Sequence, residues 1–370
     1  MNRHHNTSDT CRQRHWRDAL SIAALCLVAG APLAWADDAS RVVIRPLDAW
    51  SGVFADSRVT FRFSAKSDVQ RTERLAWSLS AKGRTVTRGE VAMELTEGKT
   101  TLLALPVRMP HVREGVILKT TLSVSVVGND DSSASDVEQT IWIFPQDAFS
   151  DRQQWLTKLQ IQLYDPEEKT GTVLEEAGIP FETLQTLASL KTVDSGMVLI
   201  GSGISLKDYP KLGSIMAQLA TLGVPVLCLT PADGVVPIPI GVLGNEHPVR
   251  EPEQEVVRPQ SVMFRQRDIA RQLDKRLDAN AWFGGGSIKQ GFRFASVDER
   301  VVMESVSTGQ GWPWIEVYYP NDRGRLILCG FGIVEQWNDS PVPRYLLLRI
   351  LQRMSDKTSP ANINTQTEEK

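Results

Sequence analysis

The strongest potential nucleophiles in this sequence are two cysteines, Cys228 and Cys329, each of which lies in a short apolar run. A cysteine thiol becomes a catalytic nucleophile when a base, usually a histidine, lowers its pKa. Beyond residue 36 the sequence has only two histidines. His111 lies in the other half of the chain, and His247 lies in a proline-rich loop. The sequence therefore does not predict cysteine catalysis, and it leaves open whether the two thiols are free or joined in a disulfide.

Other catalytic and cofactor motifs are also missing from the sequence. There is no Gly-x-Ser-x-Gly, the motif that positions the serine of many hydrolases. The pair Gly201-x-Gly203 lacks the third glycine of a dinucleotide fingerprint, so a plain strand-to-helix turn is expected there. The acidic run at 130–133 lacks the ligand spacing of a calcium loop. We therefore expect no cofactor and no metal.

Carboxylates leave one enzymatic alternative open. Glu304, Glu316 and Glu335 lie in or after late strands, and retaining glycosidases use two carboxyl groups about 5 Å apart. Trp312 and Trp314 precede Glu316 in the most aromatic segment of the chain. Aromatic faces stack on sugar rings, which makes this segment a candidate ligand surface. The alternative is that these aromatic side chains pack beneath a helix.

The elements that carry these residues alternate between strand and helix after Pro145. The run at 224–229 is apolar on both faces, as a central parallel strand is. The alternation predicts a doubly wound, mostly parallel α/β sheet of flavodoxin or amidotransferase type. The expected strands are 159–164, 197–201, 224–229, 292–296, 301–304, 314–319 and 325–329, and the expected helices are 171–177, 206–222, 268–281 and 342–354.

Ligands of doubly wound sheets bind at the carboxyl ends of the strands. The strand at 224–229 ends near Asp233, and the strand at 325–329 leads to Glu335 and Trp337. Two further strand ends are Tyr164-Asp165 and 201–203. The candidate ligand-binding residues are therefore Trp312, Trp314, Glu316, Asp233, Glu335 and Trp337.

The half before Pro145 alternates with the period of a β-strand. In the run Val59 to Phe63 every second residue is apolar, so one face enters a core. Seven short strands separated by turns predict an immunoglobulin-like sandwich. The expected strands are 42–45, 58–64, 74–80, 85–95, 101–107, 118–127 and 139–144, with Phe61, Phe63, Trp77, Leu79, Leu103 and Trp142 in the core.

Residues 1–36 are typical of a secretory signal peptide. Four arginines precede an uncharged apolar run at 19–34, and Ala34-Trp35-Ala36 fits a signal peptidase site. The apolar run is shorter than the roughly 20 residues of a spanning helix. We expect cleavage near Ala36 and export to the periplasm or the extracellular space. An uncleaved anchor is the alternative.

The mature chain expected after cleavage has 334 residues, with 37 basic and 42 acidic side chains. It has no basic run that would follow a phosphate backbone, so nucleic acid is not an expected partner. No later segment is long and apolar enough to span a membrane. The length predicts two domains, the sandwich at 40–147 and the α/β domain at 148–355, followed by a disordered tail at 356–370.

The order of these parts resembles a known family. The segment Ile141-Trp142-Ile143-Phe144-Pro145 closes a sandwich, a strand at 198–201 and the run 223–227 follow, and Glu335-Gln336-Trp337 precedes a leucine-rich helix. This order is similar to accessory regions of bacterial β-galactosidase-type (glycoside hydrolase family 2) proteins. There an immunoglobulin-like domain precedes a class I glutamine-amidotransferase-like domain. The Cys-His-Glu triad of the amidotransferases cannot be placed on this chain, so the resemblance implies a non-catalytic relative.

Three functions remain open from the sequence. The first is an exported, non-catalytic module for binding or assembly, associated with polysaccharide processing, whose partner is a glycan or another exported protein. The second is a carbohydrate-active hydrolase that uses a carboxylate pair. The third is a structural oligomerisation protein. The sequence favours a protein that is not an enzyme, and it leaves the oligomeric state open.

Overall fold

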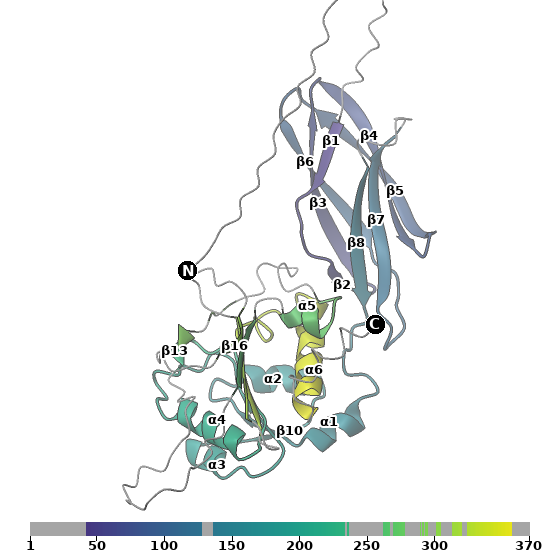
Figure 1. Cartoon of the computed structure of the whole chain (residues 1–370). Helices are drawn as coiled ribbons and strands as arrows, with labels where there is room; N and C mark the ends of the chain where they lie inside the picture. Colours follow the sequence, from purple (N-terminus) through teal and green to yellow (C-terminus); the bar gives the residue numbers. More distant parts are fainter. Residues whose placement is uncertain are drawn as a thin grey trace, which may run out of the picture. The chain divides into compact units, whose positions relative to one another are not determined.

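The chain contains an all-β part followed by an α/β part (Figure 1). The computed structural model describes residues 42–127, 136–233, 235–236, 262–266, 269–277, 289, 291, 293–294, 301–304, 313–319 and 324–356. The expected signal peptide at 1–36 and the expected tail from 357 onward lie outside these residues. Among the described residues, no helix is long and apolar enough to cross a membrane.

The all-β part has two sheets, with strand orders β1-β3-β6 and β2-β8-β7-β4-β5. The strands form because apolar residues alternate with polar ones, and β3 shows this as a strict alternation of exposed and buried side chains along most of its length. Every strand expected here is confirmed within three residues at either end. The bounds are β1 Val42–Pro46, β2 Gly52–Phe54, β3 Arg58–Ser67, β4 Arg71–Ala81, β5 Arg84–Leu95, β6 Thr100–Arg108, β7 Leu118–Val126 and β8 Val137–Phe144.

The core of the all-β part forms between these two sheets. Phe61, Phe63, Leu79 and Leu103 are buried in it, as the alternation predicted. Trp77 is only partly buried; it packs against this core and over Gly89 on the neighbouring strand. A Cβ at Gly89 would lie 2.7 Å from the Trp77 ring. The expected core residue Trp142 is also only partly buried, and it packs against the cluster of the α/β part.

The α/β part is built on an eight-stranded sheet with the order β10-β9-β11-β12-β18-β17-β14-β16. All neighbouring strands are parallel except that β17 runs antiparallel to both β18 and β14. The strand bounds are β9 Ile161–Tyr164, β10 Phe181–Thr183, β11 Met197–Ile200, β12 Val226–Leu229, β14 Val262–Gln266, β16 Val301–Glu304, β17 Trp314–Tyr318 and β18 Arg325–Cys329, and a separate pair is formed by β13 Val235–Val236 and β15 Arg293–Phe294.

Helices cover both faces of this sheet, which is why its central strands are apolar on both sides. One apolar cluster contains residues of α1, α2, α5 and α6, and the other contains residues of α3 and α4. In β12, Leu227 and Leu229 enter the first cluster, whereas Val226 and Cys228 enter the second. The helix bounds are α1 Gln153–Leu159, α2 Lys169–Glu176, α3 Leu187–Lys191, α4 Leu212–Thr221, α5 Ile269–Leu273 and α6 Pro341–Ser355.

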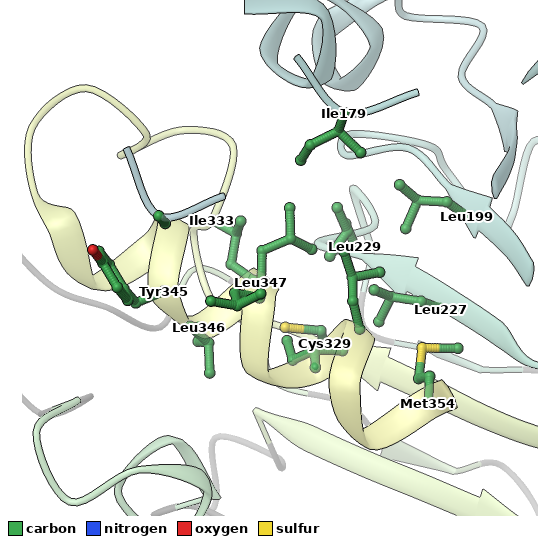
Figure 2. Packing of buried hydrophobic residues seen from close by; sticks show 14 of the residues in the cluster. Ile179, Leu199, Leu227, Leu229, Cys329, Ile333, Tyr345, Leu346, Leu347 and Met354 are labelled. Atoms are coloured by element: carbon green, nitrogen blue, oxygen red, sulfur yellow. The ribbon is translucent and has the colours of Figure 1, made fainter. Parts of the chain in front are cut away.

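The closing helix α6 contributes much of the first cluster. Ser340 caps its first turn by accepting a hydrogen bond from Val342 N, and Pro341 stands at the first helical position. Figure 2 shows apolar side chains of α6, among them Leu347 and Met354, in one cluster with Leu227 and Leu229 of β12 and Cys329 of β18. The burial of this face positions the loop that precedes α6, which contains Glu335 and Trp337.

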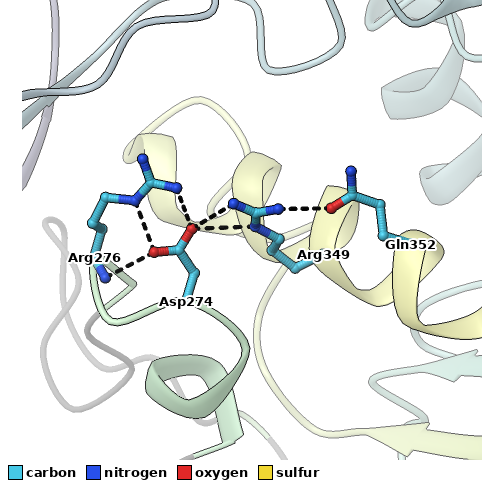
Figure 3. Close-up of polar contacts among 4 residues, drawn as sticks. All are labelled: Asp274, Arg276, Arg349 and Gln352. Atoms are coloured by element: carbon cyan, nitrogen blue, oxygen red, sulfur yellow. Dashed lines mark hydrogen bonds and ion pairs between the residues drawn. The ribbon is translucent and has the colours of Figure 1, made fainter. Parts of the chain in front are cut away.

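A buried carboxylate joins the segment after α5 to α6 (Figure 3). Asp274 accepts hydrogen bonds from Arg276 and from Arg349, with 2.8 Å between Arg349 Nη2 and Asp274 Oδ2. Burial opposes ionisation of Asp274, but the hydrogen bonds from the two arginines outweigh it and lower its pKa to about 2.

Residues of the all-β part also contact α6. The rings of Phe144 and Tyr345 lie 4.8 Å apart between centroids. The Arg344 guanidinium donates to the carbonyl of Gln146 at 2.9 Å and lies 4.8 Å from the centre of the Phe54 ring. Strand β2 thus contributes to the same packing as α6.

Several elements differ from expectation. The short helices α1 and α3 and the short strands β2, β10, β13 and β14 were not expected, and the helix expected at 268–281 covers only Ile269–Leu273 among the residues that the structure describes. Strands β2, β10 and β14 have three to five residues each, too few to show a period. The helix expected at 206–222 begins only at Leu212. Pro210 explains the later start, because the residue before a proline is disfavoured in the helical conformation.

Candidate functional site

The order of the strands creates a switch point between β9 and β11. The chain passes from β9 to β10 on one side, then returns across β9 to β11 on the other. Helix α2 packs on one face of the sheet and α3 on the opposite face. In doubly wound sheets such a reversal opens a crevice at the carboxyl ends of the strands. Asp165 follows β9 and Ser202 follows β11, so both residues stand at this point.

Asp165 holds the start of α2. Its Oδ2 accepts hydrogen bonds from the backbone N–H groups of Thr170, at 2.7 Å, and Gly171, at 2.8 Å. Its Oδ1 is buried with no partner among the described residues. A Cβ at position 201 would lie 2.1 Å from Oδ1, so only Gly201 fits beside this carboxyl group. Burial raises the pKa of Asp165 more than the two backbone hydrogen bonds lower it.

Ser202 is connected to two other elements. Its backbone N–H donates to Thr170 Oγ1 at 2.8 Å, and its Oγ donates to Glu335 Oε1 at 2.5 Å. A hydroxyl hydrogen-bonded to a carboxylate is the arrangement of a nucleophile and its base. Ser202, however, is only 1% exposed, whereas Glu335 is exposed. The hydroxyl is therefore out of reach of a substrate, and the contact holds the loop after β11 against the loop before α6.

Thr230 occupies a strained turn at the end of β12. Its φ of 30° is rare for a β-branched residue, and such strain is often found at functional sites. Sharp turns after a parallel strand position the nucleophile of α/β-hydrolases. Here Thr230 Oγ1 donates to the carbonyl of Phe331 at 2.7 Å, and the residue is buried. Like the Ser202 hydroxyl, the Thr230 hydroxyl is buried and forms a hydrogen bond within the chain.

The two cysteines lie on opposite faces of the sheet. Cys228 pairs with Leu328 across β12 and β18, so Cys329, one residue further, points to the other side. Cys228 belongs to the cluster with α4 and Cys329 to the cluster with α6. Both are free and buried. Burial raises the pKa of both thiols, that of Cys329 to about 12, so neither is an activated nucleophile.

Two of the six candidate residues from the sequence lie at this carboxyl edge. Glu335 contacts Ser202, as described above. Asp233 Oδ2 accepts from Ser205 Oγ at 3.0 Å and from the backbone N–H of Lys207 at 3.2 Å. These contacts hold the loop after β11 to the end of β12.

The aromatic segment around Glu316 is inside the protein. Trp314 and Glu316 are both fully buried. Glu316 forms ion pairs with Arg353, at 2.9 Å, and with Arg325, at 3.2 Å. Neither side chain can meet a ligand while the sheet and α6 keep this packing. Trp312 lies outside the described residues.

Trp337 is also buried, with 3% of its surface exposed. Its ring stacks on Phe149 with 6.3 Å between centroids, and the Arg344 guanidinium lies 5.5 Å from the ring centre. This ring is therefore part of the packing around α6 and not of a solvent-facing wall.

Sequence reasoning named the strand ends at Asp165 and Ser202 but did not select either residue as functional. Nothing in the sequence relates Ser202 to Glu335, because the chain between them contains five further strands of the sheet. Thr170 was missed as well, since a threonine in the first turn of a helix is unremarkable. Among the described residues, no group of three or more His, Cys, Asp or Glu side chains could hold a metal ion.

The chain matches no known family model and no curated protein. A β-glucosidase from Listeria innocua in complex with gluconolactone is similar at 10% identity and a TM-score of 0.23, over 29% of this chain and 16% of that chain. The sporulation control protein Spo0M from Bacillus subtilis is similar at 8% identity and a TM-score of 0.22, over 32% and 55% of the two chains. This chain therefore spans about a sixth of the β-glucosidase and about half of Spo0M. Likenesses at these scores define neither its fold nor its function.

Proposed function

We propose that this chain is an exported, non-catalytic binding module whose α/β part presents the carboxyl edge of its sheet to a glycan. The observation that carries the proposal is the closed contact between Ser202 and Glu335 at the switch point. The position where α/β proteins perform chemistry here holds a buried hydroxyl. Three further candidate nucleophiles among the described residues, Thr230, Cys228 and Cys329, are buried as well.

The exposed rim of this edge supports binding of a polar, neutral ligand. Lys169 Nζ lies 3.4 Å from the point where a Cβ at Gly203 would stand, and Glu335 is exposed beside Gly332. Lysine donors and carboxylate acceptors together match the hydroxyl groups of a sugar, which both donate and accept hydrogen bonds. The rim thus fits a glycan without requiring a charged one.

The finer fold assignment and the export route belong to the same proposal. The sheets of the all-β part place β1, β3 and β6 opposite the other five strands, an arrangement that supports an immunoglobulin-like sandwich. The α/β order supports an amidotransferase-like domain without its triad, and the pattern of residues 1–36 supports a cleaved signal peptide. Together they support the resemblance to accessory regions of glycoside hydrolase family 2 proteins.

The test is a glycan array followed by thermal-shift titration of the chain from residue 37 to 370. We expect one class of sugar to raise the melting temperature saturably, and Lys169→Gln to reduce this shift. Lys99→Gln is the matched control, because Lys99 is an exposed lysine in a turn of the all-β part. Trp314→Ala is unsuitable as a binding variant, since Trp314 is fully buried.

Two results would contradict the proposal. Hydrolysis of a bound glycan, lost in Glu335→Gln, would establish the enzymatic alternative. The absence of any sugar-dependent shift, together with a mass that rises with concentration in light scattering, would favour the oligomerisation protein.

A further inference from the structure

The outward face of the sheet formed by β1, β3 and β6 gathers positive charge (Figure 1). Alternate side chains of these strands enter the core, and the others are exposed to solvent. None of the three strands contains an aspartate or a glutamate. The whole chain has a formal net charge of −3, so the surplus is local to this surface. We call it the cationic face, and its charged side chains are Arg45, Arg58, Arg62, Lys66 and Arg108.

The register of the strands brings these side chains together. In an antiparallel pair, directly opposite residues have Cβ atoms about 4.5 to 5.5 Å apart, and diagonal neighbours lie about 7 to 8 Å apart. Arg58 of β3 is directly opposite Arg108 of β6. Arg45 of β1 is opposite Ser64 and therefore diagonal to Lys66. The cations come from three strands but form one patch, which no linear run of basic residues indicates.

The opposition of Arg58 and Arg108 is unfavourable in the free chain. Like charges directly opposite each other on one face of a sheet are destabilising. Both residues are exposed, and neither forms an ion pair with another described residue. The same holds for Arg45 and Lys66. An anionic partner would supply the counter-charges that the described part of the chain does not.

The remaining cation of this face, Arg62, has a partner within the chain. Its guanidinium pairs with Asp48 at 2.6 Å, while 67% of the arginine side chain stays exposed. The other sheet of the all-β part differs, because its outward side chains carry both signs. There Arg74 pairs with Glu90 at 3.4 Å. The unbalanced charge is therefore a property of one face and not of the whole all-β part.

Exposed apolar side chains lie among the cations. Leu102 of β6 is 74% exposed and stands opposite Ser64. Val43 of β1 is 38% exposed and stands opposite Lys66. A linear polyanion gains nothing from an exposed leucine. A lipid surface uses both kinds of group, because apolar side chains enter the boundary between headgroups and acyl chains while cations meet anionic headgroups. The combination favours a lipid surface.

We propose that the cationic face docks the chain on an anionic lipid surface, with its basic side chains against headgroup phosphates and Leu102 in the interface. The contact is peripheral and requires no spanning helix. It involves only the all-β part, whereas the proposed glycan site lies in the α/β part. The two proposals are therefore independent.

The experiment is cosedimentation with vesicles of phosphatidylcholine alone and of equal parts phosphatidylcholine and phosphatidylglycerol. The chain from residue 37 to 370 is used, because the apolar run at 19–34 would itself bind to vesicles. We expect binding to the mixed vesicles only, lost at high salt through screening. Lys66→Gln and Arg108→Gln should each weaken binding about fivefold, the contribution of one basic side chain near an anionic membrane.

The charge variants have an internal check on folding and a matched control. Arg108→Gln removes the repulsion with Arg58, so the melting temperature should not fall although binding weakens. Arg88→Gln is the control, because Arg88 is an exposed arginine on β5, an edge strand of the other sheet. Its binding should equal that of the unchanged chain. An equal loss in Arg88→Gln would overturn the assignment to the cationic face.

Leu102→Ser distinguishes a lipid surface from a linear polyanion. We expect it to weaken binding to mixed vesicles several-fold and to leave retention on immobilised dextran sulfate unchanged. Leu222→Ser is the matched control, because Leu222 is 69% exposed in the α/β part. Vesicle binding that Leu102→Ser leaves unchanged would overturn the proposal in favour of a polyanionic partner. Equal binding to the two kinds of vesicle, or binding to neither, would also overturn it.

Discussion

Ser202 and Glu335 are 133 positions apart in the chain, yet Ser202 Oγ donates a hydrogen bond of 2.5 Å to Glu335 Oε1. The two residues follow β11 and β18, which are separated in the sheet by β12. One partner is buried and the other exposed. This asymmetry makes the contact testable.

Removing Glu335 should destabilise the chain more than removing Ser202. Glu335→Ala leaves a buried hydroxyl without its acceptor, which costs about 1 to 2 kcal/mol of unfolding free energy. Ser202→Ala leaves an exposed carboxylate that water solvates, so we expect a loss of about 0.5 to 1 kcal/mol. Urea unfolding of both variants measures the two values. The reverse order would show that Ser202 Oγ finds another acceptor.

Asp274 should make stability fall in acid. Its pKa of about 2 in the folded state lies below the ordinary value of about 3.9. The folded state therefore stabilises the ionised form of Asp274. The resulting contribution, about 2 kcal/mol, is complete above about pH 4 and is lost as the pH falls toward about 2.

The measurement is urea unfolding of the wild-type chain and of Asp274→Asn at about pH 6 and about pH 3. We expect the difference in unfolding free energy between the two proteins to shrink at the lower pH. Asp68→Asn serves as the control, because Asp68 is an exposed aspartate in a turn of the all-β part. An equal difference in unfolding free energy at both pH values would mean that ionisation of Asp274 does not stabilise the folded state.

Glu316 should be essential for folding and not for binding. Glu316→Ala removes the buried carboxylate that pairs with Arg325 and Arg353, and breaking a buried ion pair in this way costs about 3 to 5 kcal/mol. Arg353→Ala should lower the unfolding free energy less. The side chain of Arg353 is 18% exposed, and Glu316 retains its ion pair with Arg325. Thermal unfolding compares the two. A stable Glu316→Ala protein would contradict the packing around α6.

The thiols of Cys228 and Cys329 should be unreactive until the protein unfolds. Burial raises the pKa of Cys228 and Cys329, and their positions on opposite faces of the sheet prevent a disulfide between them. A chromogenic thiol reagent should therefore react with neither cysteine in buffer and with both in denaturant. A missing thiol signal in denaturant without reductant would reveal a disulfide.

The strands of the all-β part were predictable because their signal is local. A half-buried strand alternates apolar and polar residues, as the run Val59 to Phe63 does, and the turns between strands are marked by glycine and polar residues. The central strands of the α/β part were predictable for a related reason. Being covered on both faces, they are almost entirely apolar: β12 has no polar side chain, and β18 is apolar after Arg325.

Whether the candidate ligand residues are buried or exposed could not be predicted from the sequence. Trp314 and Glu316 have the same residue types whether they face a sugar or a helix, and only the packing of α6 on β17 determines which. Glu316 is the clearest case. Its burial depends on Arg325 from β18 and Arg353 from α6, two partners that no local pattern relates to it.

The sequence by itself determined most of the longer elements, their approximate bounds and the lack of a recognisable catalytic motif, because these depend on neighbouring residues. Only the tertiary structure determined which polar groups meet. Asp165, Ser202 and Glu335 converge because the strand order places β9, β11, β12 and β18 side by side. A pocket beside Arg325 lies where α1 and α6 end at the same edge of the sheet. Such contacts join distant segments, and their free energy depends on burial, which a linear sequence does not show.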